Sequence, residues 1–218
     1  MNGRKSGVVW PAHIPRWTHP WLRLWWPGTH WATDAKSAVH LTFDDGPDPD
    51  VTPWVLDELA ARGMKATFFV VGEQAERHPD LLAHIQAAGH ALGGHTMRHE
   101  HGWKTDVDPY VESAVASLQT ASSSGVFRPP YGKFTRTQAK RLSTHARIVM
   151  WDVLSGDHAI RDDRGVEAAR RRLRKHTRPG SIVVFHDSAK HGEDMRRLLP
   201  SYLDWLADQG WTSKGLQG

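Results

Sequence analysis

The chain has 218 residues, a net charge of +4 and no cysteine. Its length suits one large domain or two small ones, and 39% hydrophobic residues are enough to form a core. Without cysteine, disulfides and thiolate chemistry are excluded, while the modest positive charge does not by itself indicate nucleic-acid binding, and we expect none. The fifteen histidines favour metal binding or acid–base chemistry.

The first 37 residues stand apart because they hold six tryptophans with four prolines between them. This proline spacing excludes a long helix, so we predict an irregular arm, residues 1–37, packed on a domain of residues 38–218. Six tryptophans are too much apolar surface to leave in water, so we expect the arm to bury them. The alternative is peripheral membrane contact through the arm, because Trp and Arg favour the bilayer interface.

No targeting or membrane-spanning segment is predicted. No apolar run is long enough to cross a bilayer. His13, Arg16 and His19 interrupt the apolar residues near the N-terminus, so we see no secretory signal peptide. On this pattern we expect a cytoplasmic location.

From residue 38 onward, strand and helix patterns alternate with short connections. This alternation predicts an α/β domain with a mostly parallel sheet. Strands are expected at 38–43, 66–71, 91–95, 126–128, 148–153, 181–186 and 211–216. Helices are expected at 52–62, 79–88, from 107 to the serine run at 122–124, at 135–144, at 163–177, and at 193–209 with a kink at Pro200.

Polar side chains follow the predicted strands where each one ends. The first strand stops at the adjacent pair Asp44-Asp45, before Gly46-Pro47 turns the chain. Two neighbouring carboxylates repel each other, and a metal ion is the obvious counter-charge. In a parallel barrel the chemistry lies at the C-terminal ends of the strands. The further polar residues at such ends are His95, Arg128, Asp157, His186 and Asp187.

A histidine pair, His95 and His99, has the spacing of a metal site. Residues four apart in a helical turn face the same way, so both imidazoles could grip one ion. Two histidines and one carboxylate leave open positions on a zinc-type ion, which favours a catalytic site over a structural one. His101 has the wrong spacing for that face, and we interpret it as a surface or supporting residue.

Five stretches, in chain order, resemble the motifs of the polysaccharide deacetylases, the NodB-homology group or carbohydrate esterase family 4. The resemblance runs from about residue 38 to residue 211. It implies a distorted (β/α) barrel and metal-dependent removal of N-acetyl groups from an acetylated amino sugar or glycan. The stretches are Thr42-Phe43-Asp44-Asp45-Gly46-Pro47, His95-Thr96-x-x-His99, Arg128-Pro129-Pro130-Tyr131-Gly132, Trp151-Asp152-x-x-x-x-Asp157 and Ile182-Val183-Val184-Phe185-His186-Asp187.

The resemblance also implies a metal centre and a general base. Asp45, His95 and His99 are expected to hold one divalent ion, Zn²⁺ by expectation, with Co²⁺ or another divalent ion as alternatives. The ion would lower the pKa of a water molecule and polarise the acetyl carbonyl. Asp44 is expected to be the general base that deprotonates this water.

The remaining roles that the resemblance implies concern the leaving group and the oxyanion. His186 is expected to be the general acid that protonates the leaving amine, with Asp157 raising the pKa of His186. Arg128 would hold Asp44 ionised and oriented. The backbone N–H of Tyr131, together with the metal, would stabilise the tetrahedral oxyanion.

The chain departs from the family pattern at two positions that usually line the acetyl pocket. His158 stands where the family often has Trp, and Val184 stands where it often has Leu. Trp151 could supply a wall of the pocket instead. These departures concern the substrate rather than the reaction, so hydrolysis of another linear or cyclic amide on the same fold is the alternative function.

Two readings from other classes are weaker. A two-His-one-carboxylate iron oxygenase shares the ligand set, but it would leave Asp44, Arg128 and His186 without a role. A basic binding module finds support in the arginine-rich run 170–178. We interpret that run as the solvated face and C-terminal end of a helix, where cations complement the helix dipole.

Overall fold

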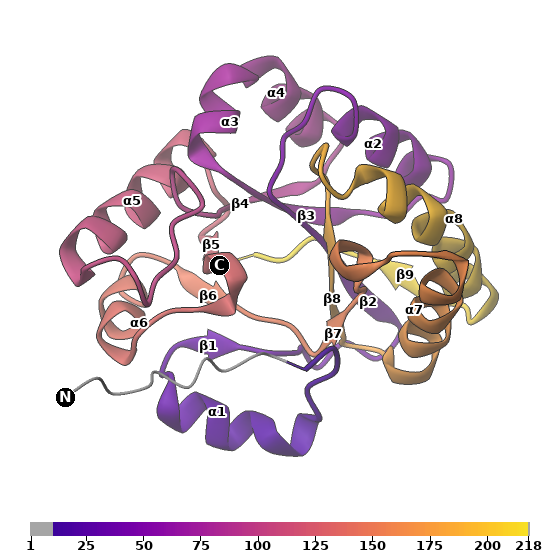
Figure 1. Ribbon diagram of the computed structural model, residues 1–218, viewed down its shortest axis with the longest axis horizontal. Coiled ribbons are helices and arrows are strands. Elements are labelled where there is room, and N and C mark those ends of the chain that lie inside the picture. The colour runs from indigo at the N-terminus through magenta and orange to yellow at the C-terminus, as the bar shows by residue number, and fades with distance from the viewer. Residues whose placement is uncertain (1–10, 218) are drawn as a thin grey trace.

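In the computed structural model, which describes residues 11–217, one sheet curls into a barrel with helices packed around its outside (Figure 1). The strand order is β1-β6-β5-β4-β3-β2-β8-β7, and β9 pairs with β2 separately. These pairs are parallel, which confirms the predicted α/β barrel. The strands are β1 (Thr29–His30), β2 (Ala38–Asp44), β3 (Ala66–Val70), β4 (Ala91–Gly94), β5 (Val126–Phe127), β6 (Arg147–Val149), β7 (Val153–Leu154), β8 (Ile182–His186) and β9 (Thr212–Ser213).

Two of the helices, α6 and α7, begin at residues whose side chains cap them. Thr135 forms a capping box with Gln138, and the Asp162 side chain accepts the Gly165 N–H. Among residues 11–217, no helix is both long and apolar enough to cross a membrane. The helices are α1 (His19–Trp25), α2 (Thr52–Ala60), α3 (Gly72–Arg77), α4 (Pro79–Ala87), α5 (Val107–Thr120), α6 (Arg136–Leu142), α7 (Asp163–His176) and α8 (Gly192–Asp208), with 3-10 turns η1 (Arg16–Thr18), η2 (Pro130–Gly132) and η3 (Asp157–Ala159).

Strand β2 is the centre of the sheet. It pairs with β3 on one side and β8 on the other, and all seven of its residues are buried. The Phe43 ring stacks on Phe68 and Phe185 from these neighbours, with ring centroids 5.1 and 5.8 Å apart. A strand covered on both faces has its residues fixed in register, so the end of β2 places Asp44 at a defined point on the rim.

The N-terminal arm fills the gap between the two edges of the sheet. β1 pairs with β6, while the Ile14 N–H donates to Asp152 O and the Leu154 N–H donates to Ala12 O beside β7. Figure 1 shows α1 and β1 at the bottom of the barrel, between β6 and β7. The arm predicted as irregular therefore contains a helix and a strand, and it completes the barrel wall.

Burial of all the arm's tryptophans was the wrong expectation. Trp31 is fully buried and Trp26 packs on the core, but Trp17, Trp21 and Trp25 are 75%, 64% and 64% exposed. Trp17 lies in η1 and the other two lie in α1, and their spacing puts all three on the side of this segment that faces away from the core. Trp10 lies outside the described residues.

Three other details differ from the sequence prediction. Helix α3 went unpredicted, because its sequence carries a single inward apolar residue, Ala75. The expected strand 148–153 is two strands, since the chain leaves β6 and crosses at Met150–Asp152 to pair with β8 as β7. Helix α8 spans the stretch predicted as helical and includes Pro200, with buried leucines on both sides of it. The last strand is limited to the two residues of β9.

Candidate active site

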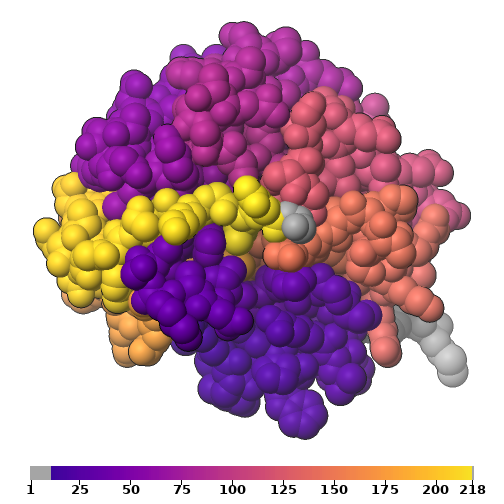
Figure 2. Space-filling model, turned by 180° about the vertical axis from the view of Figure 1, so that it is seen from behind, coloured from indigo at the N-terminus to yellow at the C-terminus, as the bar shows by residue number. Residues whose placement is uncertain are grey.

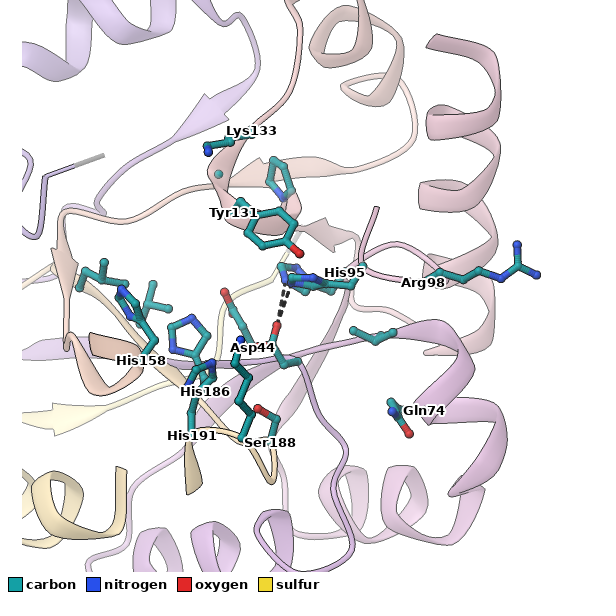
Figure 3. A pocket seen from close by; sticks show the side chains of 18 of the residues that line it. Asp44, Gln74, His95, Arg98, Tyr131, Lys133, His158, His186, Ser188 and His191 are labelled. Carbon is teal, nitrogen blue, oxygen red and sulfur yellow. Dashed lines mark ion pairs between the residues drawn. The ribbon is translucent and has the colours of Figure 1, made fainter. Parts of the chain in front are cut away.

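A cavity of about 650 Å³ opens at the C-terminal ends of the strands (Figure 3). Asp44 ends β2, His95 follows β4, Arg128 follows β5, and His186 ends β8. Parallel pairing brings these ends to one rim, which is why residues far apart in sequence meet here. In Figure 3, Asp44 lies between His95 on one side and His186 on the other.

Asp45, His95 and His99 converge as the sequence predicted. The Nε2 atoms of His95 and His99 lie 3.5 and 3.0 Å from Asp45 Oδ1, and the two ring centroids are 5.1 Å apart. Each of the three residues can offer one ligand atom to a common ion. His101 does not join this group, and its ring lies against Tyr131 instead.

The donor set fits a divalent cation. Asp45 Oδ1 is buried and accepts no hydrogen bond, which is costly for a carboxylate unless a cation binds there. His95 Nδ1 lies 2.7 Å from Arg128 O, which fixes the proton on Nδ1 and leaves the Nε2 lone pair for a metal. Burial acts to raise the pKa of Asp45, but its contacts with His95 and His99 outweigh burial and lower the pKa.

The prediction that His95 and His99 share a helical turn is wrong. Both lie in the loop after β4, and the rings meet because Thr96 and His99 adopt left-handed φ values of 60° and 59°. Asp45 (φ 79°) and Tyr131 (φ 59°) are left-handed too. Non-glycine residues in this region are strained, and such strain gathers at functional sites. Backbone strain of this kind was not readable from the side-chain spacing.

Asp44 is paired with the buried guanidinium of Arg128. Arg128 Nη1 donates to Asp44 Oδ1 at 2.7 Å and to Thr42 Oγ1 at 2.6 Å. The other guanidinium nitrogens donate to the backbone carbonyls of Val149 and Met150, and the group lies 4.2 Å from the centroid of the Phe69 ring. Because all three guanidinium nitrogens of Arg128 donate to acceptors, the side chain is held in one orientation with its positive charge beside Asp44.

His186 and Asp157 form the second charged pair of the cavity. His186 Nδ1 lies 2.8 Å from Asp157 Oδ1, and the backbone N–H of His186 donates to Asp157 Oδ2 at 2.8 Å. Burial alone would lower the pKa of His186, but the Asp157 carboxylate outweighs burial and raises it to about 10. Burial also acts to raise the pKa of Asp157, yet the charge of His186 holds it below its ordinary value.

Tyr131 and the two departures from the family pattern also line the cavity. Tyr131 follows the Pro129-Pro130 turn, is 53% exposed, and packs edge-on against His99 with centroids 4.5 Å apart. His158 and Val184 both face the cavity, and Trp151 is part of the same wall. The ring of His158 lies 5.3 Å from that of His186, so the residue at this position contacts the predicted acid.

The sequence reasoning assigned no role to Asp187, which the structure places beneath Asp44. Its backbone N–H donates to Asp44 O at 3.0 Å, and its Oδ2 accepts the Thr52 hydroxyl at 2.6 Å. A Cβ on Gly46 would lie 2.4 Å from this carboxylate, so the glycine makes room for it. The adjacency of Gly46 to the acid pair was the available signal, but it was interpreted only as a turn.

Comparison with known proteins gives the same family. The family model described as polysaccharide deacetylase matches residues 32–146. The chain belongs to the polysaccharide deacetylase family. This membership confirms the deacetylase hydrolase class that the sequence predicts.

Individual relatives in this family cover most of the chain. Over 70% of its own length, this chain is 34% identical to a peptidoglycan-N-acetylglucosamine deacetylase of Bacillus cereus, and the matched part covers 57% of that relative. It is 33% identical to a chitooligosaccharide deacetylase of Azorhizobium caulinodans, covering 74% of this chain and 79% of the relative. A solved peptidoglycan N-acetylglucosamine deacetylase superposes with a TM-score of 0.82 at 27% identity, over 93% of this chain and 95% of the other.

Proposed function

We propose that this protein hydrolyses the N-acetyl amide of an N-acetylglucosamine-containing glycan with the help of one divalent metal ion. The observation that carries the proposal is the arrangement of three groups around one cavity. Asp45, His95 and His99 lie close enough to hold one cation on one side, and His186, the acid candidate, lies on the other. The base candidate, Asp44, lies between them (Figure 3).

Asp45, His95 and His99 are the residues that would hold the ion. A divalent ion supplies Lewis acidity, which lowers the pKa of a water molecule and polarises an acyl oxygen. Zn²⁺ is the ion we expect for a two-His, one-carboxylate set with open positions. The hydrogen bond of His95 to Arg128 O keeps its ring oriented toward the ion.

The proton transfers fall to Asp44 and His186. Arg128 occupies Asp44 Oδ1, which leaves Oδ2 to accept the proton of the attacking water. The water oxygen forms a bond to the acetyl carbon, the C–N bond breaks, and His186 gives its proton to the departing amine. Asp157 keeps His186 protonated for this step, because its carboxylate favours the imidazolium. The products are acetate and a free amino sugar.

Substrate binding is supported by the shape and lining of the cavity. Trp151, Leu154 and Val184 offer apolar surface for the acetyl methyl group. The exposed ring of Tyr131 offers a flat surface beside the metal site, and its backbone N–H is our candidate for the oxyanion donor. The relatives named as peptidoglycan and chitooligosaccharide deacetylases give the substrates to try first.

The test is release of acetate from chitin oligomers, peptidoglycan fragments and small N-acetyl sugars by the full chain. We expect Asp44→Asn to keep the metal and lose about 10²–10⁴-fold in rate, as for a general base. Asp50→Asn is the matched control, because Asp50 is an exposed carboxylate outside the cavity. Near-full activity of Asp44→Asn would refute the base assignment, and inactivity on every acetylated sugar would favour the alternative amide substrates.

A further inference from the structure

Helix α1 carries an apolar face that nothing in the structure covers. Trp17, Trp21, Leu24 and Trp25 are 75%, 64%, 64% and 64% exposed. Among residues 11–217, the exposed large hydrophobic side chains are these four and Tyr131, which is 53% exposed. Trp17 lies in the 3-10 turn η1 directly before α1, the other three lie in α1, and their spacing puts all four on one side of this helical segment. We call these four residues the α1 tryptophan face.

The α1 tryptophan face points away from the core. Leu22 and Trp26, on the other side of the helix, pack on the core, and His19 is buried. Just before the helix, Arg16 Nη2 donates to Pro179 O at 2.8 Å. Figure 2 shows this segment, in indigo, as a lobe that projects at the lower end of the molecule. Because the inner side is already packed, α1 cannot turn its tryptophans into the barrel.

The surroundings of this face are positively charged. Residues 11–33 contain no Asp or Glu, so Arg16 and Arg23 are the charged side chains of this stretch at neutral pH apart from its histidines. Beside Trp17, Arg16 and Arg178 line a hollow of about 250 Å³. One carboxylate, Asp152, lies in the same hollow; it is buried and pairs with Arg16 at 3.3 Å.

We propose that the α1 tryptophan face docks the protein onto the surface of an anionic lipid bilayer. Trp favours the headgroup level, where its ring meets the acyl chains and its N–H meets water. Arg23 and Arg178 are exposed and would meet lipid phosphates, and each such cation contributes to binding an anionic leaflet. The proposal commits to peripheral binding, since α1 has seven residues and is too short to span a membrane.

Two other occupants fit less well. A glycan platform combines aromatic rings with polar side chains for the sugar hydroxyls, but residues 11–33 contain no Asp, Glu, Asn or Gln. A second copy of this chain would bring Arg16 and Arg23 against the same arginines, which repel each other. The proposed docking is independent of the deacetylase function, because none of the cavity-lining residues belongs to α1.

The test is sedimentation of the full chain with lipid vesicles of phosphatidylcholine alone or with a quarter phosphatidylglycerol. We expect binding to the anionic vesicles, weaker binding at high salt, and quenching of Trp emission by brominated lipid. The variant Trp17→Gln/Trp21→Gln/Trp25→Gln should lose about tenfold or more in partitioning. Gln keeps helix propensity, and thermal melts and acetate release would confirm that this variant is folded.

A matched charge pair separates the arginines from general electrostatics. Arg23→Glu should weaken binding to anionic vesicles by about fivefold or more. Arg77→Glu makes the same charge change on α3, across the barrel from α1, and should leave binding unchanged (Figure 1). Equal loss of vesicle binding in Arg23→Glu and Arg77→Glu would overturn the role of this charged face. Equal binding of the wild type to neutral and anionic vesicles would do the same.

The remaining outcomes decide the occupant. No vesicle binding by the wild type, or equal binding by the triple tryptophan variant, would overturn the proposal. Wild-type retention on chitin or peptidoglycan that the triple variant loses, without vesicle binding, would assign the face to a glycan. Sedimentation velocity showing dimers that the triple variant abolishes, again without vesicle binding, would assign it to a second copy.

Discussion

Replacing Asp157 with Asn should move the alkaline limb of the pH–rate profile to lower pH. Asp157 Oδ1 accepts a hydrogen bond from His186 Nδ1 at 2.8 Å. The Asp157 charge raises the pKa of His186 from an ordinary value of 6.5 to about 10. The acid must carry a proton to give to the amine, so activity is lost as pH rises through the pKa of His186. Asn removes the negative charge, the pKa falls, and activity is lost at a lower pH.

The size of the shift follows from the contact. An opposite charge this close moves a pKa by about 1–3 units, and we expect the limb to move by that amount. A divalent ion held by Asp45, His95 and His99 would lower the pKa of His186 in wild type and variant alike, so the difference between their alkaline limbs is the quantity to measure. The pKa values read from the two limbs belong to the coupled site as a whole and not to single residues.

The same substitution should also cost stability. The Asp157 oxygens accept two backbone N–H groups, from His158 at 2.9 Å and from His186 at 2.8 Å. Asn has one oxygen and one NH₂ group, so one of these buried donors loses its acceptor, at a cost of about 1–3 kcal/mol. The variant must therefore be assayed well below its melting temperature.

The assay is kcat against pH for acetate release, beside a thermal melt of each protein. Asp57→Asn is the control, because Asp57 is an exposed carboxylate on α2. An unmoved alkaline limb in a folded Asp157→Asn protein would refute the reasoning and give Asp157 a structural role. A shift of the same size in the control would point to a general charge effect instead.

Three further predictions follow from the described contacts. The double variant His95→Ala/His99→Ala should fall from about one bound divalent ion to almost none by metal analysis, and unchanged content would remove the site assignment. Trp31→Ala should cost about 3–5 kcal/mol, because the ring is fully buried, and lower Tm by about 6–20 °C. Exposed Trp21→Ala should stay within about 0.5 kcal/mol, and equal losses would contradict the assigned burial. Thr52→Val leaves Asp187 without its hydroxyl donor and should reduce stability by about 1–3 kcal/mol in urea titration.

The chemistry-bearing residues were predictable because parallel strands bring their C-terminal ends together. Asp44, Arg128 and His186 each stand at the end of an apolar run, and that position alone sends them to one rim. The resemblance to the deacetylases then separated the ligand candidate Asp45 from the base candidate Asp44, which local sequence could not do. The cavity brings together every site residue that the sequence predicted except Arg128 and Asp157, which lie behind Asp44 and His186.

What the sequence left open depends on contacts between distant segments. The left-handed turns at Thr96 and His99 are set by the way the loop after β4 packs, not by residue spacing. Which tryptophans of the arm are buried depended on where α1 would lie against the barrel. Asp187 gains its position from Thr52, a residue that no motif links to it. Hydrophobic periodicity shows which face of a single helix or strand is buried, whereas these features depend on contacts between two or more elements.

The closing of the barrel by the arm also sets an order of assembly during synthesis. β1 leaves the ribosome early, but its partner β6 and the neighbouring β7 and β8 are made much later. Until then the Trp31 side chain has no complete pocket, so we expect the arm to become ordered only after these later strands are made. Nascent chains arrested before β8 should thus remain cleavable by protease between α1 and β2, and full-length chains should resist.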